Sequence, residues 1–189
     1  MTDRVGITTT IPVEILFAGG CVPCDLNNIF VTDDNPGRFI ERAERDGFPK
    51  SMCNWVKGIY GVVVDENIDK VITVMEGDCS NTQALAEIFR YRGIRTIPFS
   101  YPFDRDGEVL AREVSKLNTA FSVDQETLAL VDQGIEETRL RLQEIDRLTW
   151  QERRVTGYEN HLWLVRASDM MGDYRHYGAM ANDFIEDVR

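Results

Sequence analysis

The clearest chemistry in the sequence is carried by its four cysteines: Cys21, Cys24, Cys53 and Cys79. The N-terminal segment MTDRVGITTT lacks the basic and apolar regions of a secretory signal, so we expect a cytoplasmic protein. In that setting cysteines favour metal binding or redox chemistry over disulfides. Burial of a small hydrophobic side chain is the alternative explanation for any one of them.

Cys79 is the strongest candidate for a metal ligand. It lies in the segment GDCSN, directly after an expected buried strand and directly before an expected helix. In a parallel α/β sheet that position is the carboxyl end of a strand, where ligands bind. The N–H groups at the helix start stabilise negative charge, which favours a thiolate and an anionic iron–sulfur cluster.

Cys53 is the second candidate. It lies in PKSMCNWVKG, within the first turns of a helix that we expect to begin at Pro49. If the sheet is parallel, this helix start lies on the same edge as Cys79, and two thiolates can meet at one metal centre. The spacing of the two cysteines does not by itself establish that meeting.

Cys21 and Cys24 form a C-V-P-C pair, which is compatible with zinc, a cluster or a redox dithiol. No second CxxC follows, which argues against a four-cysteine zinc ribbon. A thioredoxin-like dithiol site, with Pro98 as the matching proline, is an alternative. The pair follows two glycines and does not open a long helix, which weighs against it. We interpret His161 and His176 as surface or packing residues.

Alternating strand-like and helix-like segments predict an α/β lobe over residues 1–107, with a parallel, Rossmann-like sheet, followed by an α-helical segment over residues 108–189. We expect strands at 4–8, 70–75 and 95–101, a strand or loop at 22–27, and helices at 12–18, 36–46 and 80–91. Capping-box spacings at Ser80, Ser122 and Thr149 predict three helix starts, the second opening a long helix. The third is expected to extend over 149–171, and one further helix is expected at 174–188.

Charge and hydropathy exclude two classes of partner. The formal net charge is −11 and the isoelectric point about 4.7, so the chain repels nucleic-acid phosphates. The arginines between residues 139 and 154 alternate with acidic residues, as on a solvated helix face. No apolar run approaches the roughly 20 residues that a membrane-spanning helix needs.

Four segments, in the same order, resemble the 2-hydroxyglutaryl-CoA dehydratase D-component family, which is related to benzoyl-CoA reductase subunits and double-cubane cluster proteins. They are IPVEILFAGGCVPCDLNN (11–28), MCNWVKG (52–58), GDCSNTQALAE (77–87) and IPFSYPFDRD (97–106). The resemblance implies a [4Fe–4S] or larger cluster with Cys53 and Cys79 as ligands, and low-potential electron transfer from an ATP-dependent activator protein to an acyl-CoA thioester.

The sequence departs from this family in two respects. First, the C-V-P-C pair is not expected in a plain dehydratase subunit, and additional cysteines near the site would suit a larger cluster, as in the double-cubane proteins. Second, family subunits are about twice as long and draw a further cluster cysteine from a second lobe, whereas no cysteine follows Cys79 here. The missing ligand is then expected from another lobe or subunit, or from Cys21 or Cys24. The leading hypothesis is an iron–sulfur subunit of a dehydratase-like enzyme. The alternative is a non-catalytic cluster scaffold or electron-transfer subunit that needs a partner.

Overall fold

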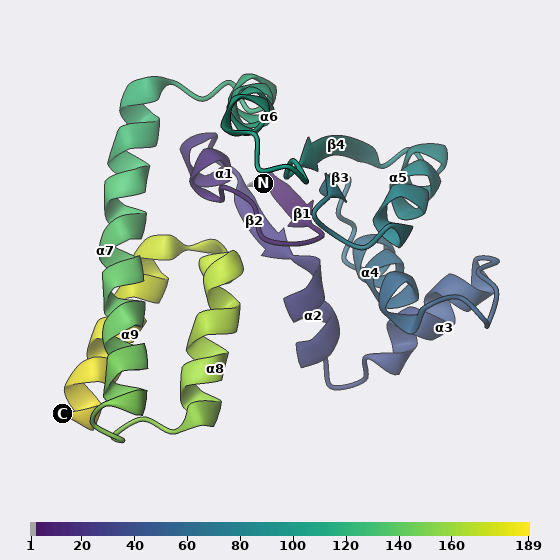
Figure 1. Cartoon of the computed structure of the whole chain (residues 1–189). Coiled ribbons are helices and arrows are strands. Elements are labelled where there is room, and N and C mark those ends of the chain that lie inside the picture. The colour runs from purple at the N-terminus through teal and green to yellow at the C-terminus, as the bar shows by residue number, and fades with distance from the viewer. Residues whose placement is uncertain (1–2) are drawn as a thin grey trace.

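The computed structural model describes residues 3–189 and centres on a four-stranded parallel sheet (Figure 1). The strands lie in the order β2-β1-β3-β4, so the chain crosses over between β2 and β3. Their bounds are β1 Arg4–Ile7, β2 Val22–Asp25, β3 Lys70–Glu76 and β4 Arg95–Ser100. The predicted parallel α/β fold is therefore confirmed.

Both faces of the sheet are buried, which explains the apolar, β-branched character of β3. Neighbouring residues of that strand point to opposite sides: Val71 joins one hydrophobic cluster and Ile72 the other. This alternation fixes the register of β3 against β4. Val71 lies opposite Thr96, and Ile72 lies opposite Ile97. The two clusters form the core on which the helices pack.

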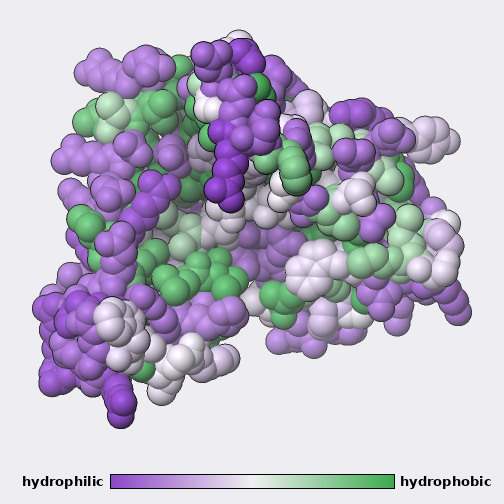
Figure 2. Space-filling view, in the orientation of Figure 1, coloured by the Kyte–Doolittle hydropathy of each residue, from purple (hydrophilic) through white to green (hydrophobic). Residues whose placement is uncertain are grey.

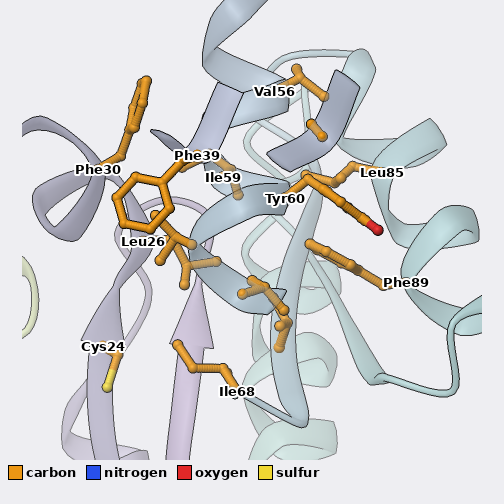
Figure 3. Packing of buried hydrophobic residues seen from close by; sticks show 14 of the residues in the cluster. Cys24, Leu26, Phe30, Phe39, Val56, Ile59, Tyr60, Ile68, Leu85 and Phe89 are labelled. Carbon is orange, nitrogen blue, oxygen red and sulfur yellow. The ribbon is translucent and has the colours of Figure 1, made fainter. Parts of the chain in front are cut away.

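Helices cover each face of the sheet. One face carries α1 (Glu14–Ala18) and α6 (Gly107–Ala120), the second of which contributes the buried Leu117. The other face carries α2 (Leu26–Thr32), α3 (Gly37–Arg45), α4 (Asn54–Asp65) and α5 (Asn81–Tyr91). Figure 3 shows the aromatic centre of this second cluster, where Phe39, Tyr60 and Phe89 are buried.

The C-terminal helices form a layer of their own beside the sheet (Figure 1). It consists of α7 (Gln125–Trp150), α8 (Gly157–Val165), two short 3-10 turns, η1 (Arg166–Ser168) and η2 (Met170–Gly172), and α9 (Tyr174–Val188). The apolar stripe of α7 is buried against α9, with Ile135 and Ile145 fully covered. Figure 2 shows the molecule hollowed between these helices and the rest, with hydrophobic residues along the hollow.

One buried carboxylate joins this helical layer to the sheet. Asp169, between η1 and η2, accepts the backbone N–H of Asp25 at the end of β2 (2.7 Å) and that of Met171 (3.0 Å). The turn that presents it has left-handed backbone at Met170 and Met171. Because both residues are non-glycine, the turn is held in a sparsely populated conformation by its surroundings.

Several predicted boundaries are wrong. Residues 22–27 are not a single strand or loop, because β2 ends at Asp25 and α2 begins at Leu26. The helix expected from Pro49 begins at Asn54. The helix expected at 149–171 does not begin at Thr149, since α7 runs through Trp150 and α8 begins at Gly157. Within residues 3–189, no helix has the length and apolar character needed to cross a membrane.

Candidate functional site

Cys53 and Cys79, from two separate helix starts, line one cavity of about 220 Å³. The cavity lies at the carboxyl edge of the parallel sheet, the edge where ligands bind in this class of fold. Both thiol-bearing residues are exposed. The rest of the lining is polar at the sheet edge and apolar beneath, comprising Thr8, Asn27, Trp55, Val56, Ile59, Asp78, Thr82 and Leu85.

Cys53 is the residue that caps the N-terminus of α4. Its carbonyl accepts the N–H of Lys57 (3.1 Å), and its side chain makes no capping hydrogen bond, so the thiol is left for other contacts. Two residues later, Trp55 donates its indole N–H to Oδ1 of Asn27 (2.7 Å). The ring also packs edge-on against Phe30, with centroids 5.4 Å apart. These contacts fix the first turn of α4 beside α2.

Cys79 is held in a short loop between β3 and α5. Gly77 enters the loop with φ +92°, and a Cβ added there would lie 2.9 Å from Cβ of Tyr101. Only glycine satisfies both conditions without strain. The Asp78 carboxylate then accepts the N–H of Cys79 (2.6 Å) and the hydroxyl of Thr82 (3.1 Å). The carbonyl of Cys79 accepts the N–H of Thr82 (2.9 Å), which closes the first turn.

The predicted capping box at Ser80 is absent from this helix start. Ser80 already has helical backbone angles and makes no side-chain capping bond, and Gln83 donates to the carbonyl of Met75 (3.1 Å). The polar donor that reaches Cys79 is the side-chain amide of Asn81, whose Nδ2 lies 3.5 Å from the sulfur. The thiol therefore meets a side-chain donor where free backbone N–H groups were expected.

The ends of β1 and β2 complete the polar wall of the cavity. Asn27 donates to the carbonyl of Thr8 (2.8 Å) and to Oδ1 of Asp25 (2.9 Å), so its amide is fixed in one orientation. The hydroxyl of Thr8 accepts the N–H of Val74 (3.1 Å), which extends the β1–β3 pairing by one residue. Hydrogen bonds therefore hold Asn27 and Thr8 in place at the edge of the sheet near the two thiols.

Cys21 and Cys24 do not line this cavity. Cys21 precedes β2 and is buried in the cluster under α1 and α6, whereas Cys24 lies within β2 and is buried in the opposite cluster. Figure 3 shows Cys24 at the end of its cluster away from Val56 and Leu85, which line the cavity. Burial raises the pKa of both thiols, with Arg4 partly opposing the rise at Cys24.

The C-V-P-C pair also lacks the placement of a thioredoxin-type site. A reactive dithiol opens a helix and exposes a thiol of lowered pKa. Here the two sulfurs lie in different core clusters, and burial moves both pKa values in the other direction. Cys21 and Cys24 therefore occupy positions typical of buried core residues.

The sulfur donors at the cavity are the two thiols, and the one carboxylate among the described lining residues, Asp78, is engaged by the N–H of Cys79 and the hydroxyl of Thr82. Within the described part of the chain, no group of three or more His, Cys, Asp and Glu residues is arranged to hold a metal ion. His161, on α8, and His176, on α9, belong to the C-terminal helical layer and do not line the cavity. A cluster ordinarily takes four protein ligands, so two thiols supply half of such a set.

The sequence did not single out four of the residues that build this site: Thr8, Asn27, Trp55 and Asn81. Asn27 and Asn81 each lie two residues from an aspartate or cysteine at a helix start, the spacing at which a short amide reaches back to the preceding residues. That spacing was the available signal. The contact between Trp55 and Asn27 joins residues 28 positions apart, so no local sequence pattern indicates it.

The structure is thus that of an α/β protein with a parallel sheet. Two exposed thiols, each from a different helix start, form a site at the carboxyl edge of that sheet. The family model for the 2-hydroxyglutaryl-CoA dehydratase D-component matches residues 8–189, and the chain belongs to that family. It is thus a component of the 2-hydroxyacyl-CoA dehydratase type, as the resemblance predicted. A comparison with curated proteins found no match.

Proposed function

We propose that this chain is an iron–sulfur subunit of a 2-hydroxyacyl-CoA dehydratase-like enzyme, in which Cys53 and Cys79 bind the cluster. The observation that carries the proposal is the convergence of these two exposed thiols on one cavity at the carboxyl edge of the sheet. When bound, the cluster supplies low-potential electron transfer to an acyl-CoA thioester, a reaction class that membership of the family supports.

The residues of the chain have separable tasks in this proposal. Cys53 and Cys79 supply thiolate ligands, and the Asp78 and Gly77 loop fixes where the second of them lies. Apolar side chains beneath the cavity, among them Val56 and Leu85, keep water from that side. The opposite side is open, since both thiols are exposed. Cys21 and Cys24 take no part as ligands in this assignment.

The exposure and number of the thiols also support a partner. Two ligands are half of a typical cluster set, and an open site does not exclude water by itself. We propose that a second dehydratase-like subunit or lobe covers the cavity and supplies further ligands, and that an ATP-dependent activator delivers the electron. The same donor count favours the second candidate function, a cluster scaffold or electron-transfer subunit that is inactive without its partner.

Anaerobic reconstitution with iron and sulfide tests the cluster. The buffer contains a small thiol, which can complete the coordination. We expect the wild-type chain to bind both elements, Cys53→Ser and Cys79→Ser to lose most of them, and the matched controls Cys21→Ser and Cys24→Ser to retain them. A colourless, iron-free wild-type protein with a reversible Cys21–Cys24 disulfide contradicts the proposal.

An activity assay then separates enzyme from scaffold. The loaded chain is mixed with a 2-hydroxyacyl-CoA, the ATP-dependent activator and, in a parallel sample, a second dehydratase subunit. Dehydration that requires only the loaded chain and the activator supports a self-sufficient enzyme. Dehydration that appears only with the second subunit supports the incomplete, partner-dependent unit.

A further inference from the structure

The two proposed ligands differ in one direct contact. Nδ2 of Asn81 lies 3.5 Å from Sγ of Cys79, within the range of an N–H···S hydrogen bond. Within residues 3–189, the sulfur of Cys53 has no corresponding donor, and Asn54, which follows it at the start of α4, makes no side-chain hydrogen bond. The site is therefore asymmetric in its polar surroundings.

The Asn81 contact is built into the loop. Asp78 holds the N–H of Cys79 and the hydroxyl of Thr82, and the carbonyl of Cys79 is bound to the N–H of Thr82. Asn81 lies between these anchored residues as the first residue of α5. The backbone that carries Asn81 is thus fixed beside Cys79 by hydrogen bonds, and from there its amide reaches the sulfur.

A donor in this position has a defined effect on a metal-bound thiolate. The sulfur carries part of the negative charge of the cluster, and that charge increases on reduction. An N–H directed at the sulfur stabilises the reduced form more than the oxidised form, and hydrogen bonds to sulfur are among the features that set cluster potentials. Neighbouring groups also orient metal ligands.

We infer that Asn81 is a positioning residue that raises the reduction potential of the cluster through the thiolate of Cys79. The inference rests on the proposed function, because it assigns a role toward the cluster that Cys53 and Cys79 bind. It makes the two cysteines inequivalent. Cys79 is the ligand whose charge the protein stabilises, and Cys53 is the ligand left to solvent or to a partner.

The test is a redox titration of the reconstituted chain, followed by electron paramagnetic resonance. Asn81→Ala removes the donor, and Asn81→Asp replaces it with a carboxylate of the same shape. We expect the midpoint potential to fall in both, further in Asn81→Asp because of the added charge. At a fixed potential the ratio of reduced to oxidised cluster should fall severalfold in Asn81→Ala, less than the roughly tenfold or more that a whole hydrogen bond to a charged group would give, because the bond is present in both oxidation states.

The matched control is Asn54→Ala, which removes the same side chain from the start of α4, next to Cys53. It should leave the potential unchanged. An acidic residue suits the first turn of a helix, so Asn81→Asp remains folded and informative even where Asn81→Ala does not. Unchanged potentials in the Asn81 variants, with iron content intact, overturn this inference alone. Failure of the wild-type chain to bind iron and sulfide overturns the proposed function instead.

Discussion

The indole of Trp55 donates its N–H to the amide oxygen of Asn27, at 2.7 Å, and this bond links the first turns of α4 and α2 across the rim of the cavity. Trp55 is about half exposed, yet its ring and its N–H are both engaged. Cys53 lies two residues before it. The position of that thiol therefore depends on a contact between helices that are distant in the sequence.

Replacing Trp55 with phenylalanine should loosen the Cys53 end of the site. The variant keeps an aromatic ring against Phe30 but loses the hydrogen bond to Asn27. We expect the free energy of unfolding, measured with urea, to fall by about 1 kcal/mol. Alkylation of Cys53, followed by mass spectrometry, should become faster. Trp150→Phe is the control, since Trp150 is exposed and its indole makes no hydrogen bond with the described residues; equal effects of the two changes would contradict the role of Trp55.

The four thiols of the native, metal-free chain should react at two distinct rates. Cys53 and Cys79 are exposed, so iodoacetamide should modify them first. Cys21 and Cys24 should react slowly, because they are buried and burial raises the pKa of both thiols. Peptide mapping after a time course measures each rate. Modification of either buried cysteine as fast as Cys79 would show that the C-V-P-C pair is accessible.

Gly77→Ala should destabilise the loop that carries Cys79. The new Cβ meets Tyr101, and alanine is strained at φ +92°. A strained backbone of this kind costs about 1–3 kcal/mol, measurable as a lower midpoint of urea unfolding. Gly107→Ala, at the start of α6 with no atom close to the added Cβ, is the matched control and should be neutral or slightly stabilising. If Gly77→Ala were as stable as Gly107→Ala, the expected strain of alanine at position 77 would be refuted.

Glu144 should make stability depend on pH in the acid range. Hydrogen bonds from Arg147, and then from Arg189, lower the pKa of its carboxyl from 4.5 to about 2. A lowered pKa in the folded state gives stability that is present above the ordinary value and is lost as the pH falls toward the folded value. Glu144→Gln should therefore be less stable than wild type at neutral pH, and the difference should close between about pH 5 and pH 2.

The measurement for Glu144 is the free energy of unfolding of both proteins across that pH range. Glu137→Gln serves as the control, because the Glu137 carboxylate makes no hydrogen bond or ion pair with the residues that the structure describes. The loss of stability at neutral pH should be larger for Glu144→Gln than for Glu137→Gln. Equal losses would mean that the two arginines do not stabilise the Glu144 carboxylate.

Local patterns in the sequence were sufficient for the sheet and for the placement of the two thiols at helix starts. The run KVITVM predicts β3 because a strand buried on both faces needs continuous apolar residues. The loop after it then follows from the strand and the helix that flank it. Sequence alone did not reveal that Cys53 and Cys79 line one cavity, since that depends on how α4 and α5 pack on the sheet.

The wrong helix starts that rested on capping-box spacings share one physical cause. A Ser or Thr three residues before Glu or Gln is a necessary feature of a capping box but not a sufficient one. Thr149 instead donates its hydroxyl to the carbonyl of Ile145 within α7 (2.9 Å), and the formed box lies at Thr156 and Glu159. Ser122 is displaced by Asp124, which caps α7. Tertiary contacts decide which of several candidate residues caps a helix, and local spacing in the sequence does not show those contacts.

The anchoring of the helical layer by Asp169 extends further than one contact. Asp169 holds the N–H of Asp25, the Asp25 carboxylate holds Asn27, and Asn27 holds Trp55. An unbroken relay of hydrogen bonds therefore runs from the strained turn after α8 to the helix start that bears Cys53. A load placed on the C-terminal helices, for example when another protein binds them, would be transmitted along these hydrogen bonds to the Cys53 end of the site.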